Sequence, residues 1–222
     1  VLELSPSLIV VAPTGGTQWT RGTSYNIQWS STGTVGTLTV TLKKSGEADV
    51  VLSSTETNDG TYSVQGAVTN TITVGTGYTV VLTDGSTSAT SSSFDVVDPK
   101  SIASVQTSPS VCVVGQVCSV SFILGGGVSS VSLGYFGTST GTVVSSTTSN
   151  PYTWTVPGSV TPGTYTITAT DTTDGTVTGS TSSFTIEAAP SLAVVSPTGG
   201  TQWTRGIGYT VMWSSTGTVG TL

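Results

Sequence analysis

Carboxylates are the first side chains to consider for chemistry, because this 222-residue sequence contains eleven Asp and Glu residues and no histidine. Histidine-based acid–base catalysis and the Ser-His-Asp and Cys-His arrangements are therefore excluded. A glycosidase needs two carboxylates that face each other across a cleft. Asp84, Asp171 and Asp174 fall in turn sequences, where Asp bonds to its own backbone. No pair of acids stands out, so we predict no catalytic residue and no enzyme.

Cys112 and Cys118 are the two cysteines of the chain. Without histidine they cannot complete a tetrahedral zinc shell. The one or two carboxylates near each predicted joint are too few for the six to eight oxygens of a calcium site. We therefore predict no metal and no cofactor. The spacing alone leaves two possibilities open, a disulfide or two free, partly buried thiols.

Hydroxyl groups are the strongest signal, because Ser and Thr account for 81 residues while only 7% of the chain is charged. Ser and Thr can simply fill polar strand faces, but a surface with so little charge lacks the usual source of solubility. Strands rich in Thr and Val are also an aggregation hazard, which a coat of covalent O-glycans would reduce. No Asn-x-Ser/Thr sequon occurs. The candidate O-glycosylation residues are Ser86, Thr87, Ser88, Thr90, Ser91, Ser92, Thr138, Ser139, Thr140, Ser145, Ser146, Thr147, Thr148, Ser180, Thr181 and Ser182.

Five tryptophans could stack on sugars. Trp29 and Trp154 alternate in phase with neighbouring apolar residues, so we expect both in a core. Trp19 and Trp203 each follow a Pro-Thr-Gly-Gly turn and are the candidates for a module interface or a sugar-stacking surface. With five Lys and Arg residues and a net charge of −6, the chain is not expected to bind nucleic acid. The sequence contains no run of 18 apolar residues, so we predict no direct membrane insertion in this segment.

An internal repeat organises these residues. Residues 1–38 and 185–222 align without a gap at an offset of 184, with 27 of 38 positions identical. A more diverged repeat, offset by about 93 residues, divides the 184-residue period in two. We predict that the sequence is an internal segment of a longer tandem array. The alternative is a short or partial chain. The expected parts are the tail of a preceding module (1–6), module A (7–98), module B (101–187) and an incomplete copy of module A (190–222).

Both modules show the period-2 alternation of half-buried strands. Tyr25, Ile27 and Trp29 alternate with polar residues, and similar runs begin at Leu38, Tyr78 and Tyr165. Asn58-Asp59-Gly60, Asp84-Gly85 and Asp174-Gly175 mark turns between runs. About seven short strands in about 90 residues predict an all-β fold of tandem immunoglobulin-like β-sandwiches. Short Pro-containing linkers, such as Asp98-Pro99-Lys100, predict a rod-like array.

The diverged repeat also bears on the cysteines. Cys112 and Cys118 align with Trp19 and Tyr25, with a glycine midway in each pair. A chain reversal at that glycine would bring the two positions together on one face of a ribbon. We therefore expect an aromatic contact in module A and a disulfide in module B. A disulfide indicates an oxidising, extracellular compartment.

The motif order resembles a known group of proteins. Pro-Thr-Gly-Gly-Thr-Gln-Trp-Thr-Arg-Gly from Pro13, followed by Tyr25-Asn-Ile-Gln-Trp29, is similar to the Ig-like module of fungal-type Ser/Thr-rich, GPI-anchored cell-surface proteins, including the KRE/KNH-type wall proteins. Tyr152-Thr-Trp154-Thr-Val-Pro157 resembles the later half of that module. The resemblance implies a secreted or wall-associated surface protein and supplies no catalytic residue.

Two functions follow as hypotheses. The first is a structural repeat segment of an extracellular fibril or cell-surface stalk, coated with O-glycans and self-associating through identical repeats or chains. The alternative is a cell-surface adhesin or wall-polysaccharide-binding module, which would present exposed aromatic side chains on one face.

Overall fold

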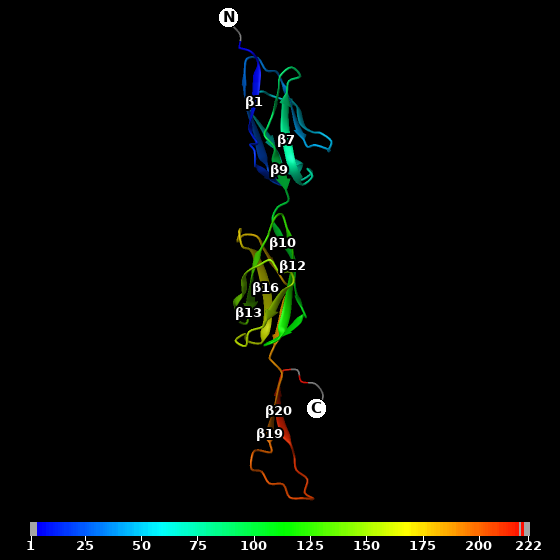
Figure 1. The fold of residues 1–222 in the computed structure, drawn as a ribbon, viewed down its shortest axis with the longest axis vertical. Helices are drawn as coiled ribbons and strands as arrows, with labels where there is room; N and C mark the ends of the chain where they lie inside the picture. The colour runs from blue at the N-terminus through cyan, green and yellow to red at the C-terminus, as the bar shows by residue number, and fades with distance from the viewer. Residues whose placement is uncertain (1–3, 218, 220–222) are drawn as a thin grey trace. The chain divides into compact units, whose positions relative to one another are not determined.

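The computed structural model describes residues 4–217 and 219, and the chain divides into two compact units, residues 1–99 and 100–222. Figure 1 shows the strands that make up both units. Each unit contains a sandwich of two sheets built from antiparallel strands, with one parallel pair. The prediction of an all-β chain of tandem immunoglobulin-like sandwiches is confirmed.

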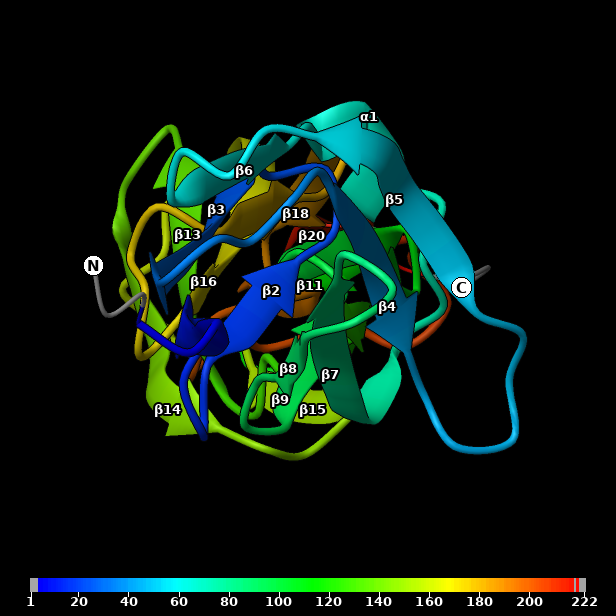
Figure 2. The same cartoon turned by 90° about the horizontal axis from the view of Figure 1, so that it is seen from above.

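Unit 1 contains a three-stranded sheet, β1-β3-β6, and a larger sheet, β2-β9-β7-β4-β5, in which β8 also pairs with β7. β5 is the outer strand of the larger sheet (Figure 2). The bounds are β1 Ser7–Ala12, β2 Gln18–Thr20, β3 Tyr25–Thr32, β4 Leu38–Lys43, β5 Val50–Glu56, β6 Thr61–Val64, α1 Gly66–Thr69, β7 Gly75–Thr83, β8 Ser88–Thr90 and β9 Phe94–Val97.

Unit 2 repeats this topology with a three-stranded sheet, β10-β12-β15, and a larger sheet, β11-β18-β16-β13-β14, in which β17 also pairs with β16. Its last two strands, β19 and β20, form a separate antiparallel pair. The bounds are β10 Ser101–Ser108, β11 Val111–Val113, β12 Val117–Gly125, β13 Val131–Gly137, β14 Gly141–Thr147, β15 Tyr152–Thr155, β16 Gly163–Asp171, β17 Thr178–Ser180, β18 Phe184–Glu187, β19 Ser191–Ser196 and β20 Met212–Thr216.

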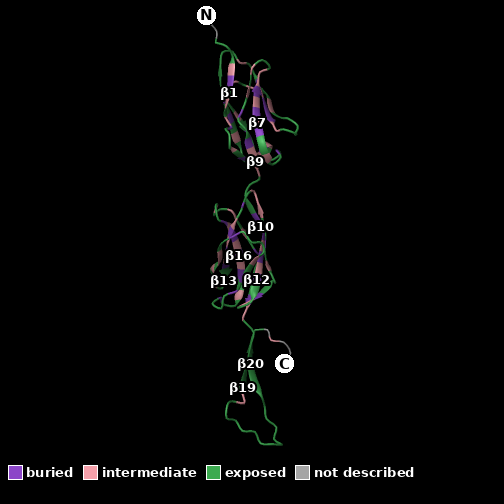
Figure 3. Cartoon of the chain, in the orientation of Figure 1, coloured by how far each residue is buried: buried purple, intermediate pink, exposed green. Residues whose placement is uncertain are grey.

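The period-2 runs form the cores. In β4, β7 and β16 every second residue is buried from Leu38, Tyr78 and Tyr165 onward, which places one face of each strand against the opposite sheet (Figure 3). Trp29 and Trp154 are 5% and 4% exposed, so the prediction that both lie in a core is confirmed. Gly60 and Gly85 adopt positive φ angles of 94° and 93° at the predicted turns, a conformation that glycine adopts without steric cost.

Two features differ from the predicted set of about seven short strands in each module. One helical turn, α1, lies between β6 and β7, where Val68 and Thr69 both donate to the Gln65 carbonyl. Four residues are too few to show a helical period in the sequence. In addition, the last strand of each sandwich is broken into two pieces, β8 and β9 in unit 1 and β17 and β18 in unit 2, which pair with the same neighbour.

A tyrosine near the start of β7 and another near the start of β16 anchor the preceding loops. The Tyr78 hydroxyl donates to the Thr73 carbonyl at 2.6 Å, and the Tyr165 hydroxyl donates to the Thr161 carbonyl at 2.6 Å. A buried tyrosine that bonds back to the chain just upstream of this strand is the tyrosine corner of immunoglobulin-like sandwiches. The alternating pattern does not predict this role, although the two tyrosines occupy equivalent repeat positions.

We expect Tyr165→Phe to lower the free energy of unfolding of unit 2 by about 1–2 kcal/mol, because it removes the hydrogen bonds of the Tyr165 hydroxyl, including the one to the Thr161 carbonyl. The Ser139 amide also donates to the Tyr165 hydroxyl at 3.1 Å, so the variant leaves two loops less well held. Urea unfolding measures the effect. Tyr152→Phe, at a half-buried tyrosine outside the corner, is the control; an equal loss in both variants would contradict the assignment.

Candidate functional site

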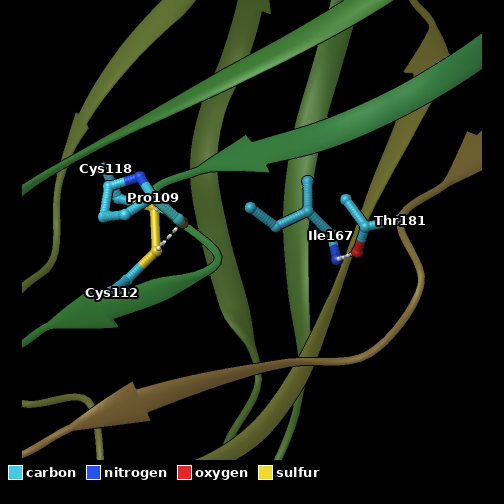
Figure 4. Close-up of a disulfide and its surroundings, with 5 residues drawn as sticks. All are labelled: Pro109, Cys112, Cys118, Ile167 and Thr181. Carbon is cyan, nitrogen blue, oxygen red and sulfur yellow. Dashed lines mark hydrogen bonds between the residues drawn. A yellow bond between two sulfur atoms is a disulfide. The ribbon is translucent and has the colours of Figure 1, made fainter.

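The turn between β11 and β12 carries the most distinctive chemistry of the chain. Cys112 and Cys118 form a disulfide with a Cα–Cα distance of 5.7 Å, which confirms the predicted pairing (Figure 4). Both side chains are at most 1% exposed. The Pro109 carbonyl oxygen lies 3.6 Å from Cys112 Sγ; because disulfide sulfur carries no proton, we regard this as a packing contact.

The disulfide joins the two sheets of unit 2. β11 belongs to the larger sheet through β18, whereas β12 belongs to the three-stranded sheet through β10 and β15. The expectation that both cysteines lie on one face of a ribbon is therefore wrong, because the chain crosses between sheets at Gly115 instead of folding into a hairpin. The bond closes the edge of the sandwich at the point where the first strand changes sheet.

Unit 1 closes the same edge with aromatic rings. Trp19 on β2 stacks on Tyr25 on β3, with ring centroids 5.2 Å apart and planes 6° from parallel. The Tyr25 hydroxyl accepts the Thr20 amide at 2.7 Å. Because β2 and β3 belong to different sheets, the stack bridges them as the disulfide does in unit 2. The expected aromatic contact in module A is confirmed.

Trp19 is not a surface platform, so the hypothesis that it stacks on sugars or lies at a module interface is wrong. It is 1% exposed, and Phe94 on β9 covers it with a centroid distance of 4.5 Å. Since Trp29 and Trp154 are also buried, these three tryptophans offer no exposed aromatic face to an adhesin or polysaccharide-binding module.

Trp203 stacks on the tyrosine equivalent to Tyr25, but its ring lies in a different environment from that of Trp19. It stacks on Tyr209 at 5.0 Å, yet it is 51% exposed. β19 and β20 reproduce the pairing of β1 and β3, and the described residues place no counterpart of β9 over the Trp203 ring. A sugar or module contact at Trp203 stays a prediction.

The candidate O-glycosylation residues divide by accessibility. Eleven of the sixteen are exposed and two, Thr87 and Ser139, are half-buried. Three are buried and do not fit the prediction: Ser91, Thr147 and Thr181 are 7–9% exposed. An enzyme could not reach these three hydroxyls in the folded sandwich.

The buried hydroxyls have structural roles. Ser91 Oγ accepts the Val80 amide at 2.9 Å. Thr181 Oγ1 accepts the Ile167 amide at the same distance of 2.9 Å (Figure 4). Each lies at the break in the last strand, so the hydroxyl stands in for a missing backbone carbonyl. Thr147 Oγ1 accepts the Ser149 amide at 3.0 Å after β14. An alternating pattern cannot show such a break, so composition alone predicts these residues to be surface hydroxyls.

The linker between the units is anchored at both ends. Arg21 pairs with Asp98 at 2.9 Å within unit 1, and Lys100 pairs with Asp171 at 2.7 Å within unit 2. Pro99 lies between these two charged residues. Two of the five basic residues of the chain are therefore placed at this joint.

Asp171 is the best-buried acid at the joint, with a side chain 0% exposed. The Lys100 ammonium, together with the Thr173 amide and hydroxyl, holds the pKa of Asp171 below its ordinary value. The Asp84 carboxylate occupies the equivalent repeat position in unit 1, where the Thr87 and Gly36 amides lower its pKa.

We expect unit 2 to lose stability as the pH falls below about 4. Because the folded pKa of Asp171 is lower than the unfolded one, its contribution is present above the ordinary carboxyl range and disappears as the pH falls through the folded pKa. Urea unfolding at pH 7, 4 and 2.5 measures this. Asp171→Asn should be less stable at pH 7 and should show a smaller acid-induced loss, with the rest coming from Asp174. An unchanged pH profile would contradict the role of this pair.

No set of three or more His, Cys, Asp or Glu residues that could hold a metal ion occurs in the described part of the chain. Among residues 4–217 and 219, no helix has the length and apolar character to cross a membrane.

No protein-family model matches the chain, and no curated protein matches it. Solved structures with a similar arrangement include fibronectin(III)-like modules of CbhA from Clostridium thermocellum, at 15% identity over 82% of this chain and 92% of that one, with a TM-score of 0.31. Sidekick-1 immunoglobulin domains 1–5 match at 14% identity over 88% of this chain and 41% of that one, with a TM-score of 0.46. Titin domains I67–I69 match at 13% identity, over 84% and 67%, with a TM-score of 0.42. The immunoglobulin-like assignment follows from strand order and the tyrosine corners; the resemblance to fungal wall proteins stays a prediction.

Proposed function

We propose that the chain is a structural repeat segment of an extracellular fibril or cell-surface stalk that carries O-glycans and associates with identical repeats or chains. The observation that carries this proposal is the joint: two sandwiches of one topology are separated by Pro99, and the residue on each side of it is ion-paired into its own unit. Such a linker limits the freedom of the chain where repeats meet.

The surface supports the glycan part of the proposal. The eleven exposed candidate hydroxyls lie on β8, β14 and β17 or in the segments beside them. β14 is the outer strand of its sheet, where unpaired backbone groups invite pairing with another chain. Sugars at Ser145, Ser146 and Thr148 would block that edge. They would also hydrate a surface that has few charged side chains to do so. The buried disulfide is consistent with an oxidising, extracellular location.

Intact-mass measurement on protein isolated from a secreting host tests the glycan part, with β-elimination to locate the sugars. We expect added mass on exposed hydroxyls and none on Ser91, Thr147 or Thr181. A bare polypeptide would overturn the glycan part. Sedimentation velocity and electron microscopy of a multi-repeat chain test the fibril part, which compact monomers alone would overturn.

A further inference from the structure

An uncharged hollow of about 300 Å³ lies on the outer face of the larger sheet in unit 2. Hydroxyl-bearing side chains and one aromatic ring dominate its lining, which includes Ser132, Phe136, Thr142, Ser145, Thr168 and Thr170. These residues come from β13 and from its two neighbours, β14 and β16. None of the lining residues is charged.

Gly134 lines the hollow. It lies opposite Thr142 on β14 and Thr168 on β16. A residue without a side chain therefore lies between two threonines in a row across three strands. A Cβ at residue 134 would lie 3.1 Å from Phe136 Cε2, which shows that the phenyl ring rests against the glycine backbone. The Phe136 side chain nevertheless stays 49% exposed. The sheet therefore presents an aromatic ring in contact with its surface, with hydroxyls on both sides.

We propose that this hollow binds a neutral carbohydrate chain, with one sugar ring stacked on Phe136 and its hydroxyls bonded to the surrounding Ser and Thr side chains. A sugar ring has an apolar C–H face and polar edges, which match the ring and the hydroxyl row. Hydroxyl side chains can donate and accept, so they suit a ligand that does both. The row continues beyond the hollow, since Thr168 Oγ1 lies 2.8 Å from Ser180 Oγ. This binding activity goes beyond a structural role for the repeat.

Other occupants fit less well. A charged ligand would find no opposite charge in the lining. An extended peptide would pair with the free edge of β14, whereas the hollow lies on the face of the sheet over β13, which is paired on both sides. Unit 1 supplies a natural comparison, because Thr41 and Lys43 occupy the positions of Gly134 and Phe136, and Lys43 is ion-paired with Asp49. The proposed site therefore belongs to unit 2 alone.

The test uses the 222-residue chain as an unglycosylated, disulfide-bonded protein, titrated with soluble neutral oligosaccharides of glucose, mannose, xylose, galactose and arabinose. We expect at least one sugar series to shift the NMR signals of Phe136 and its neighbours, with weak affinity. Phe136→Ala should weaken binding at least tenfold. Gly134→Ala should weaken it severalfold by displacing the ring. Val117→Ala, which truncates another exposed apolar residue of unit 2, should bind as the unmodified chain does.

The sugar could belong to a separate polysaccharide or to an O-glycan of the protein itself. If the glycosylated protein shows the shifted Phe136 signals without added sugar, and loses them on deglycosylation, the bound sugar is its own. If both forms respond only to added oligosaccharide, the ligand is external. If the Phe136 ring merely covers Gly134, no sugar will shift the NMR signals of Phe136, or Phe136→Ala will leave sugar binding unchanged. Either result would overturn the proposal.

Discussion

Trp19→Ala should lower the free energy of unfolding of unit 1 by about 3–5 kcal/mol, the cost of removing a large, fully buried aromatic side chain. Trp19 fills the space between Tyr25 and Phe94, which come from opposite sheets, so its loss opens a cavity where the sandwich closes. A domain of this size has only about 5–15 kcal/mol of stability in total. The variant should therefore unfold at a much lower urea concentration.

Trp203→Ala is the matched control, because Trp203 lies in the same Gln-Trp-Thr-Arg-Gly sequence and stacks on the equivalent tyrosine. With its side chain 51% exposed, we expect a change below about 1 kcal/mol. Hydrogen exchange resolved by peptide would report the two regions separately. Equal effects at Trp19 and Trp203, or an unchanged unit 1 in Trp19→Ala, would show that the stack does not hold the two sheets together.

Removing the disulfide should destabilise unit 2 by about 2–3 kcal/mol, because the bond closes a short loop and the entropic gain falls at the low end of the usual range. Cys112→Ala/Cys118→Ala is the informative variant, since both sulfurs are buried and a reductant reaches them only when the edge opens. We expect faster amide exchange in β11 and in its partner β18.

Unit 1 serves as the internal control for the disulfide, because it closes the equivalent edge with Trp19 and Tyr25 and contains no cysteine. Its exchange rates should stay unchanged in the double variant. Slow exchange of β11 in both proteins would mean that the backbone pairing with β18, and not the sulfur bridge, secures the edge.

The sequence predicted the strands well because alternation reports burial directly. The runs at Tyr25, Leu38, Tyr78 and Tyr165 became β3, β4, β7 and β16. The internal alignment was equally informative at the first edge, where it paired Cys112 with Cys118 by analogy with two aromatic residues. Both predictions depended on patterns that repeat along the chain.

Single positions where a strand breaks or changes sheet could not be predicted in this way. Ser91 and Thr181 have the composition of a surface run, yet their hydroxyls replace backbone acceptors in the ladder. Trp19 follows a Pro-Thr-Gly-Gly turn, and its three-residue strand is too short to show the alternation that would place it in a core. The hollow at Gly134 depends on what lies across two neighbouring strands, which requires the register of the sheet.

The parallel pairs β2–β9 and β11–β18 have a mechanical consequence. Each pair joins a strand near the start of a sandwich to the last strand of the same sandwich. When a unit is pulled by its two ends, the force on the first strand and the force on the last act along the strands in opposite directions. The hydrogen bonds between the two parallel strands are then loaded together in shear and do not open one at a time. The parallel pair that closes each sandwich is therefore also the pair that resists extension.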